Sequence, residues 1–116
     1  MYISMPRGDY RNFKFKPRNK DGTDADVNFD EIYITFKISR NITEMLFQKR
    51  LSNGDITKDE EGHYHFSILP EDTEKLSFKP YYYFDIELYK EEPLLKQTTV
   101  GKLELTDEIT HKENEV

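Results

Sequence analysis

Alternation of apolar and polar residues is the strongest pattern in the chain. It is clearest over Glu31–Ile38, where every second residue is Ile or Phe. A period of two places successive side chains on opposite faces of an extended strand. The pattern recurs in His63–Ile68 and Tyr81–Tyr89, so these three segments are predicted to build the core. The residues expected to face inward are Ile32, Ile34, Phe36, Ile38, Tyr64, Phe66, Ile68, Tyr82, Phe84, Ile86 and Leu88.

Weaker runs of the same kind extend the predicted strands along the chain. Between them lie turn signals in which Gly or Asn can adopt the positive φ that tight turns require. Short strands at this spacing are typical of a sandwich or barrel. The weaker strands are Asp9–Lys16, Met45–Leu51, Asp55–Lys58 and Leu95–Thr106, with Tyr2–Met5 as a possible edge, and the turns are Asn19–Gly22, Ser52–Asp55 and Glu60–Gly62.

One helical turn is expected at residues 70–76. Pro70 fits the first position of a helix, and the acidic residues after it lie at the positive end of the helix dipole. The chain of 116 residues fits a single core. We therefore predict an all-β, two-sheet sandwich of about seven to eight strands as one domain, residues 1–110. The polar tail at residues 111–116 is expected to fray.

Composition limits the possible functions. The net charge of −6 disfavours general binding to nucleic acid. The absence of cysteine excludes disulfides, thiolate chemistry and zinc sites built from cysteine. No run of 18 apolar residues occurs, and the N-terminal residues lack the apolar core of a signal peptide. We expect a cytosolic product without a membrane span.

The positive charge is concentrated near the N-terminus, where residues 1–20 carry six basic residues against Asp9. A basic strand could dock on an acidic partner or on phosphates. It could equally be a solvated strand face that the acidic remainder offsets. The basic residues singled out as candidate interface residues are Arg11, Lys14 and Lys16.

Residue types that could support chemistry are present, but not in complete arrangements. His63 and His65 share one face of a strand, yet the sequence indicates no third metal ligand. The loop Asp21–Asp26 could hold calcium but lacks EF-hand spacing, and a solvated hairpin loop is the alternative. Asp85 and Glu87 could serve glycoside hydrolysis only with a facing carboxyl. We predict no catalytic, cofactor or metal site, and no enzymatic activity.

Three tyrosines form the most distinctive predicted surface. Alternation directs Tyr81, Tyr83 and Tyr89 away from the core. Such a row could stack on sugars or close a protein interface. The rings could also cover a second layer or lie singly on the surface.

With the strands placed, the order of short motifs resembles that of a known family. The motifs are Gly8–Tyr10, Asp21–Gly22, Gly54–Thr57, Gly62–Phe66, Leu69–Thr73, Tyr83–Ile86 and Val100–Thr106. This order is similar to that of small immunoglobulin-like proteins of tailed phages and prophages, such as the N-terminal domain of baseplate upper proteins. The resemblance implies an immunoglobulin-like sandwich. It also implies a tyrosine corner at Tyr82, whose hydroxyl would bond back to the loop containing Asp72 and Thr73.

The resemblance implies a non-enzymatic structural subunit of a phage or prophage tail or baseplate. Its partners would be other virion proteins and copies of itself, with no nucleic acid, membrane or cofactor. It would be located in the virion after assembly in the bacterial cytoplasm. The alternative is a carbohydrate-binding module that uses the outward tyrosines. Because sugar platforms often use Trp and the chain has none, assembly is the preferred hypothesis.

Overall fold

The structure, a computed structural model, describes residues 1–19, 21–25, 27–40, 45–77 and 81–106. Within them the chain forms eight strands and one short helix, which confirms the predicted all-β sandwich. No helix in these ranges is long and apolar enough to cross a membrane. The elements are β1 (Tyr2–Pro6), β2 (Arg11–Phe15), β3 (Glu31–Lys37), β4 (Met45–Arg50), β5 (Ile56–Lys58), β6 (Tyr64–Ile68), α1 (Pro70–Thr73), β7 (Tyr82–Lys90) and β8 (Leu95–Thr106).

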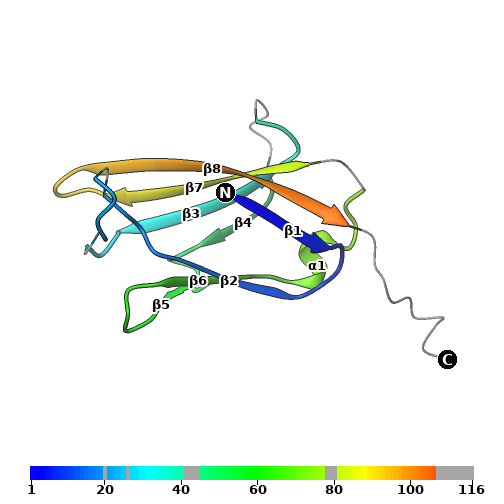
Figure 1. The fold of residues 1–116 in the computed structure, drawn as a ribbon, viewed down its shortest axis with the longest axis horizontal. Coiled ribbons are helices and arrows are strands. Elements are labelled where there is room, and N and C mark those ends of the chain that lie inside the picture. The colour runs from blue at the N-terminus through cyan, green and yellow to red at the C-terminus, as the bar shows by residue number, and fades with distance from the viewer. Residues whose placement is uncertain (20, 26, 41–44, 78–80, 107–116) are drawn as a thin grey trace.

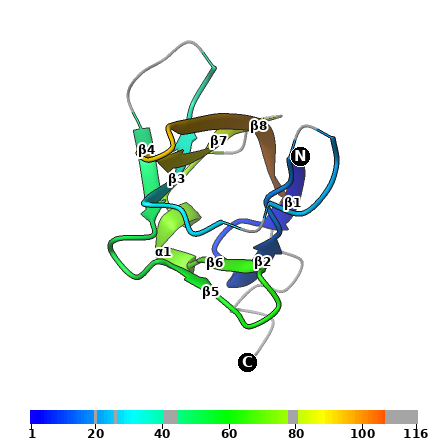
Figure 2. The same cartoon turned by 90° about the vertical axis from the view of Figure 1, so that its left-hand side faces the viewer.

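The strands form two layers. The larger sheet has the order β1-β8-β7-β3-β4 and the smaller one the order β2-β6-β5, which lies below it in Figure 1. Viewed from one end, the two sheets enclose the core between them (Figure 2). This is the strand order of an immunoglobulin-like sandwich. In the immunoglobulin lettering, β2-β6-β5 correspond to strands B-E-D, and β8-β7-β3-β4 correspond to strands G-F-C-C′. β1 extends the larger sheet by pairing in parallel with β8.

The three strongly alternating segments supply the centre of the core, as predicted. β3 and β7 are antiparallel neighbours, and Ile34 lies opposite Ile86 while Phe36 lies opposite Phe84. The ring centroids of Phe36 and Phe84 are 5.2 Å apart. Across the sandwich, β6 contributes three buried apolar side chains of the smaller sheet, namely Tyr64, Phe66 and Ile68.

The inward position predicted for Ile38 is wrong. Its side chain is 40% exposed, and β3 ends one residue earlier at Lys37. The pairing of β3 with β4 shifts register between Phe36 and Lys37. The extra residue at this shift, Leu46, belongs to β4, while β3 keeps its register with β7 as far as Lys37. Ile38 lies in the bend that follows β3, where alternation no longer directs a side chain inward.

Local signals for turns and for the helix are also confirmed. Gly22, Gly54 and Gly62 all have positive φ, at 89°, 81° and 90°. Helix α1 begins at Pro70 as expected but ends at Thr73, so it is shorter than the predicted segment. The predicted domain end at residue 110 and the tail at 111–116 lie outside the described residues.

Candidate protein–protein interface

The outer surface of the larger sheet carries a cluster of tyrosines and lysines at the end where β7 begins. Strand register places Tyr2 of β1 beside Lys102 of β8, and Lys102 beside Tyr83 of β7. Tyr81, directly before β7, meets Tyr2 edge to face with ring centroids 6.1 Å apart. We call these four residues, Tyr2, Tyr81, Tyr83 and Lys102, the tyrosine face.

Cationic groups lie over the rings of the tyrosine face. The Nζ of Lys102 is 4.8 Å from the ring centroid of Tyr81, and the Cζ of Arg40 is 5.5 Å from that of Tyr83. Such cation–π contacts contribute about 0.5 to 1 kcal/mol each at exposed sites and favour this orientation of the rings. Tyr2 and Tyr81 remain 55% and 37% exposed. Tyrosine is among the residues that are enriched in protein interfaces and at their energetic hot spots.

Tyr89 does not belong to this cluster. It lies on the same outer side of β7, but opposite Glu31 of β3 and Lys96 of β8. Six residues of strand separate it from Tyr83, which corresponds to about 20 Å. The structure therefore divides the predicted tyrosine row into a pair, Tyr81 and Tyr83, and a distant third ring.

A shallow polar groove of about 400 Å³ lies between the two ends of the outer face. Its carboxylates are paired across neighbouring strands: Asp85 lies 2.9 Å from the ammonium of Lys37, and Glu87 lies 3.3 Å from that of Lys96. Each carboxylate thus stabilises a lysine on the neighbouring strand. This arrangement is that of a surface ion-pair network rather than of two carboxyls facing across a substrate.

The basic candidates of the N-terminal segment lie in the other sheet. Arg11 and Lys14 belong to β2 and Lys16 follows it directly. Arg11 pairs with Asp9 at 3.4 Å and Lys16 with Asp24 at 3.1 Å, while Lys14 is exposed. The structure does not bring these residues to the tyrosine face, so the predicted interface residues fall on two separate layers.

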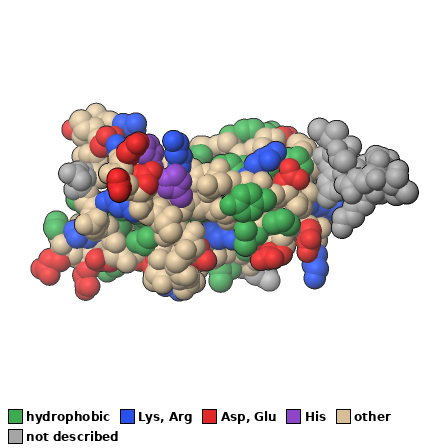
Figure 3. All heavy atoms as spheres, turned by 90° about the horizontal axis from the view of Figure 1, so that it is seen from below, with side chains coloured by type: hydrophobic (Ala, Val, Ile, Leu, Met, Phe, Trp, Pro, Cys, Tyr) green, Lys and Arg blue, Asp and Glu red, His purple; other side chains and the backbone are tan. Residues whose placement is uncertain are grey.

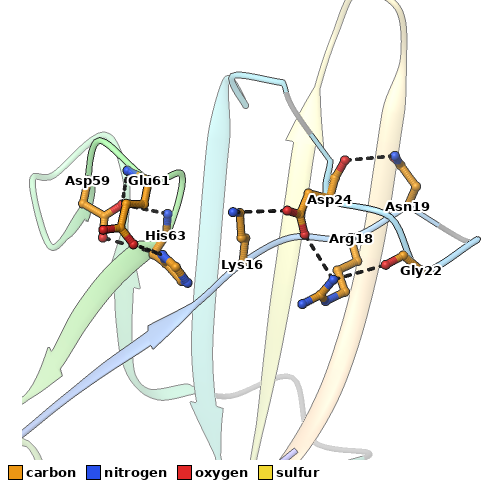
Figure 4. Close-up of polar contacts among 8 residues, drawn as sticks. All are labelled: Lys16, Arg18, Asn19, Gly22, Asp24, Asp59, Glu61 and His63. Carbon is orange, nitrogen blue, oxygen red and sulfur yellow. Dashed lines mark hydrogen bonds and ion pairs between the residues drawn. The ribbon is translucent and has the colours of Figure 1, made fainter.

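In the acidic loop considered for calcium, the carboxylates of Asp21 and Asp24 have partners within the protein. Asp24 accepts from Lys16 and Arg18, both at 3.1 Å, so two cations lie at one carboxylate (Figure 4). Asp21 accepts hydrogen bonds from the backbone N–H and the hydroxyl of Thr23. Asp26 lies outside the described residues. These contacts are those of a hairpin loop closed by its own side chains.

His63 and His65 both approach one carboxylate, that of Asp59, in the turn before β6. The Nε2 of His65 lies 2.7 Å from Oδ2 of Asp59. The Nδ1 of His63 lies 3.8 Å from the same oxygen (Figure 4). The hydrogen bond with His65 and those from the backbone of His63 and Glu61 hold the pKa of Asp59 at about 2, despite partial desolvation. No group of three or more potential metal ligands occurs among the described residues.

The histidine side chains are visible on the side of the smaller sheet. They lie at one end of this surface among acidic and basic groups (Figure 3). The other oxygen of Asp59 accepts from the backbone N–H groups of Glu61 and His63, both at 2.9 Å. Asp59 therefore closes the turn between β5 and β6, and the histidine pair belongs to that turn.

Tyr82 forms a corner of the immunoglobulin type at the start of β7. Its hydroxyl donates to the backbone carbonyl of Ser77 at 2.7 Å, five residues upstream. The predicted corner also included Asp72 and Thr73, whose side chains have other partners. Thr73 accepts from the backbone N–H of Gly8, and Asp72 accepts from Lys49 and from the backbone N–H of Leu69. The corner at Tyr82 is present, but Asp72 and Thr73 instead fasten α1 to neighbouring elements.

Three residues with important contacts were missing from the sequence-based candidates. Tyr2 was predicted only as part of a possible edge strand. Asp59 lacked any signal beyond its place before a turn. Lys49 shares its face of β4 with Phe47, and that alternation was the available sign that it points inward.

Comparison with known proteins gives no assignment. No family model, no curated protein and no solved structure matches the chain.

Proposed function

We propose that the protein is a non-enzymatic assembly domain and that its tyrosine face binds another protein. The supporting observation is the cluster of Tyr2 and Tyr81, exposed on the outer sheet beside Lys102. Tyrosine buries a large area at little cost in conformational freedom because its ring is rigid. The ammonium of Lys102 over the ring provides a second, electrostatic element of recognition.

The particle in which it assembles is proposed to be a phage or prophage tail or baseplate. Support comes from the order of turn and strand motifs along the chain and from the immunoglobulin-like strand order. Partners would be neighbouring virion proteins and further copies of the chain, and the site of assembly would be the bacterial cytoplasm.

Mass spectrometry of gradient-purified particles from the induced source bacterium tests this proposal. Peptides of the chain at stoichiometric abundance are expected. Robust absence from complete particles would exclude the virion role. In a complementation assay, Tyr81→Asp should reduce incorporation strongly, whereas Tyr10→Asp should not. Tyr10 is a suitable control because it is also an exposed tyrosine but precedes β2 of the other sheet.

Carbohydrate binding is the weaker alternative. A sugar stacks on the free face of an aromatic ring. In this protein Lys102 lies over Tyr81 and Arg40 over Tyr83, so one face of each ring already carries a cation. A glycan array with the purified chain distinguishes the two functions, and we expect no specific signal.

A further inference from the structure

Strand β8 is paired along only part of its length. β1 runs beside it from Lys102 to Thr106, and the backbone N–H of Lys102 donates to the carbonyl of Met1. From Leu95 to Gly101, β8 pairs only with β7 within the described part of the chain. Backbone groups alternate sides along a strand, so those of Lys96, Thr98 and Val100 point to the same side as those of Lys102. Among the described residues, these outward backbone groups of Lys96, Thr98 and Val100 have no hydrogen-bond partner.

A groove of about 300 Å³ lies directly beneath this unpaired edge. Thr99 is on the row of β8 that faces inward, yet it is exposed, while Leu103 and Leu105 on the same row are buried. The interior of the sandwich is thus open below the first half of β8. The groove is lined by both apolar and polar groups, which include Met1, Phe15, Pro17, Ile86, Leu88 and Gln97.

An unpaired edge above a groove is the arrangement that accepts an additional strand. The edge supplies backbone hydrogen bonds, and the groove accepts every second side chain. Residues 15–19 form the far wall of the groove, which favours a single extended segment over the edge of another folded sheet. Lys16 and Arg18 share one partner, Asp24, so this wall carries an excess of positive charge.

Residues 107–116 of the chain itself have the matching chemistry. Their sequence contains four acidic residues and one lysine, and Ile109 is the first apolar residue. If Ile109 points into the groove, the side chains of Glu108 and Thr110 lie on the outer side of the added strand. Glu108 would then lie on the face of the sheet that carries Lys96 and Lys102, and this charge complementarity favours the orientation with Ile109 inward.

The segment must come from another copy. Along β8, Thr98 is eight residues from Thr106, which corresponds to about 26 Å. Ten extended residues span at most about 36 Å, so a segment folding back would have about two residues left to pair. In addition, β1 already occupies the intervening part of the same edge.

We propose that residues 107–116 of one copy add as a strand to the Leu95–Gly101 edge of β8 in a neighbouring copy, with Ile109 in the groove. This contact joins two different surfaces, so repetition generates a ring or an open filament. It extends the proposed role in assembly to contacts between copies, and it holds whether or not the particle is a phage.

Sedimentation velocity of the full chain tests the proposal directly. Concentration-dependent association is expected, and Thr98→Pro should reduce the protein to a monomer. Proline at this edge removes an N–H that faces outward and leaves the bonds to β7 intact. Thr98→Ala retains the N–H and should associate like the unmodified chain. Far-ultraviolet circular dichroism reports whether each variant is folded.

A fluorescent peptide of residues 107–116 provides a second readout on the full chain. It should bind, compete with self-association and lose binding when it carries Ile109→Asp. The same substitution in the full chain should also give a monomer, and circular dichroism reports whether this variant is folded. A monomeric full chain that binds no peptide overturns the proposal, as does association that Thr98→Pro and Ile109→Asp leave unchanged. Detection of the chain in purified particles would be unaffected by either failure.

Discussion

The ammonium of Lys49 lies 2.7 Å from Oδ2 of Asp72, and the two side chains are only 10% and 13% exposed. The same oxygen accepts the backbone N–H of Leu69, the residue before α1. Lys49 belongs to β4, at the edge of the larger sheet, whereas α1 follows the smaller sheet. One carboxylate therefore caps the helix and also connects the two layers.

Replacement of Asp72 should be more harmful than replacement of Lys49. Asp72→Ala leaves a nearly buried ammonium without its partner and removes the acceptor for Leu69, so a loss of about 3 kcal/mol is expected. Lys49→Met removes one of the two buried charges and keeps a similar volume. The carboxylate of Asp72 then loses its cation but still accepts from Leu69, so the loss should be smaller. Urea denaturation of both variants measures this asymmetry, and equal losses would contradict it.

Removal of the hydroxyl of Tyr82 should weaken the fold without altering it. Tyr82→Phe leaves the carbonyl of Ser77 without this donor, which is expected to cost about 1 to 2 kcal/mol in the free energy of unfolding. Tyr81→Phe is the matched control, since its ring lies at the surface and its loss should stay within about 0.5 kcal/mol. Thermal denaturation of the two proteins gives the comparison.

Gly101 should not tolerate a side chain. A Cβ there would lie 2.4 Å from Cζ of Phe84 and 2.9 Å from the carbonyl oxygen of Met1. Gly101→Ala is therefore expected to lose about 1 to 3 kcal/mol through overpacking. Phe84→Leu replaces the opposing ring with a shorter side chain. The double variant should therefore lose less free energy of unfolding than the sum of the two single losses. Simple additivity would show that Phe84 is not the obstacle.

Stability should depend on Asp59 below about pH 4. Its folded-state pKa of about 2 is lower than its ordinary value of 3.8. The unfolded chain therefore binds more protons in this interval, and the contribution of Asp59 is complete above pH 3.8 and lost as the pH falls through 2. In Asp59→Asn, whose amide oxygen can still close the turn, this dependence should disappear.

Unfolding measured over a pH series for the unmodified chain and for Asp59→Asn isolates that contribution. Other carboxylates titrate in both proteins, so their effects cancel in the difference between the two curves. A difference that stays constant between pH 4 and pH 2 would assign the dependence to another group.

The fold could be predicted from the sequence because the signals for its strands and turns are local. Alternation in β3, β6 and β7 identifies the core, and the glycines mark three turns. Alternation failed at Ile38 because β3 ends at Lys37 and Ile38 lies in the bend that follows. The apolar residue at the next alternate position gave no sign that the strand had ended.

The candidate interface could be predicted from the sequence only in part, for a related reason. Alternation places Tyr81 and Tyr83 on the outer side, but strand order decides which other residues join them. Tyr2 reaches Tyr81 because β1 pairs with β8, about one hundred residues later in the chain. The basic residues of β2 were grouped with the tyrosines by exposure alone, and the division into two sheets separates them.

The parallel pairing of the first and last strands also affects how the protein forms. Tyr2 lies beside Lys102, so β1 leaves the ribosome long before its partner has been synthesised. Closing such a long loop is entropically costly, and contacts of this kind slow folding. The larger sheet can assemble from β3, β4 and β7 first, and β1 joins after β8 is in place. The part of the β8 edge that β1 occupies, Lys102–Thr106, is thus the last to be filled during folding.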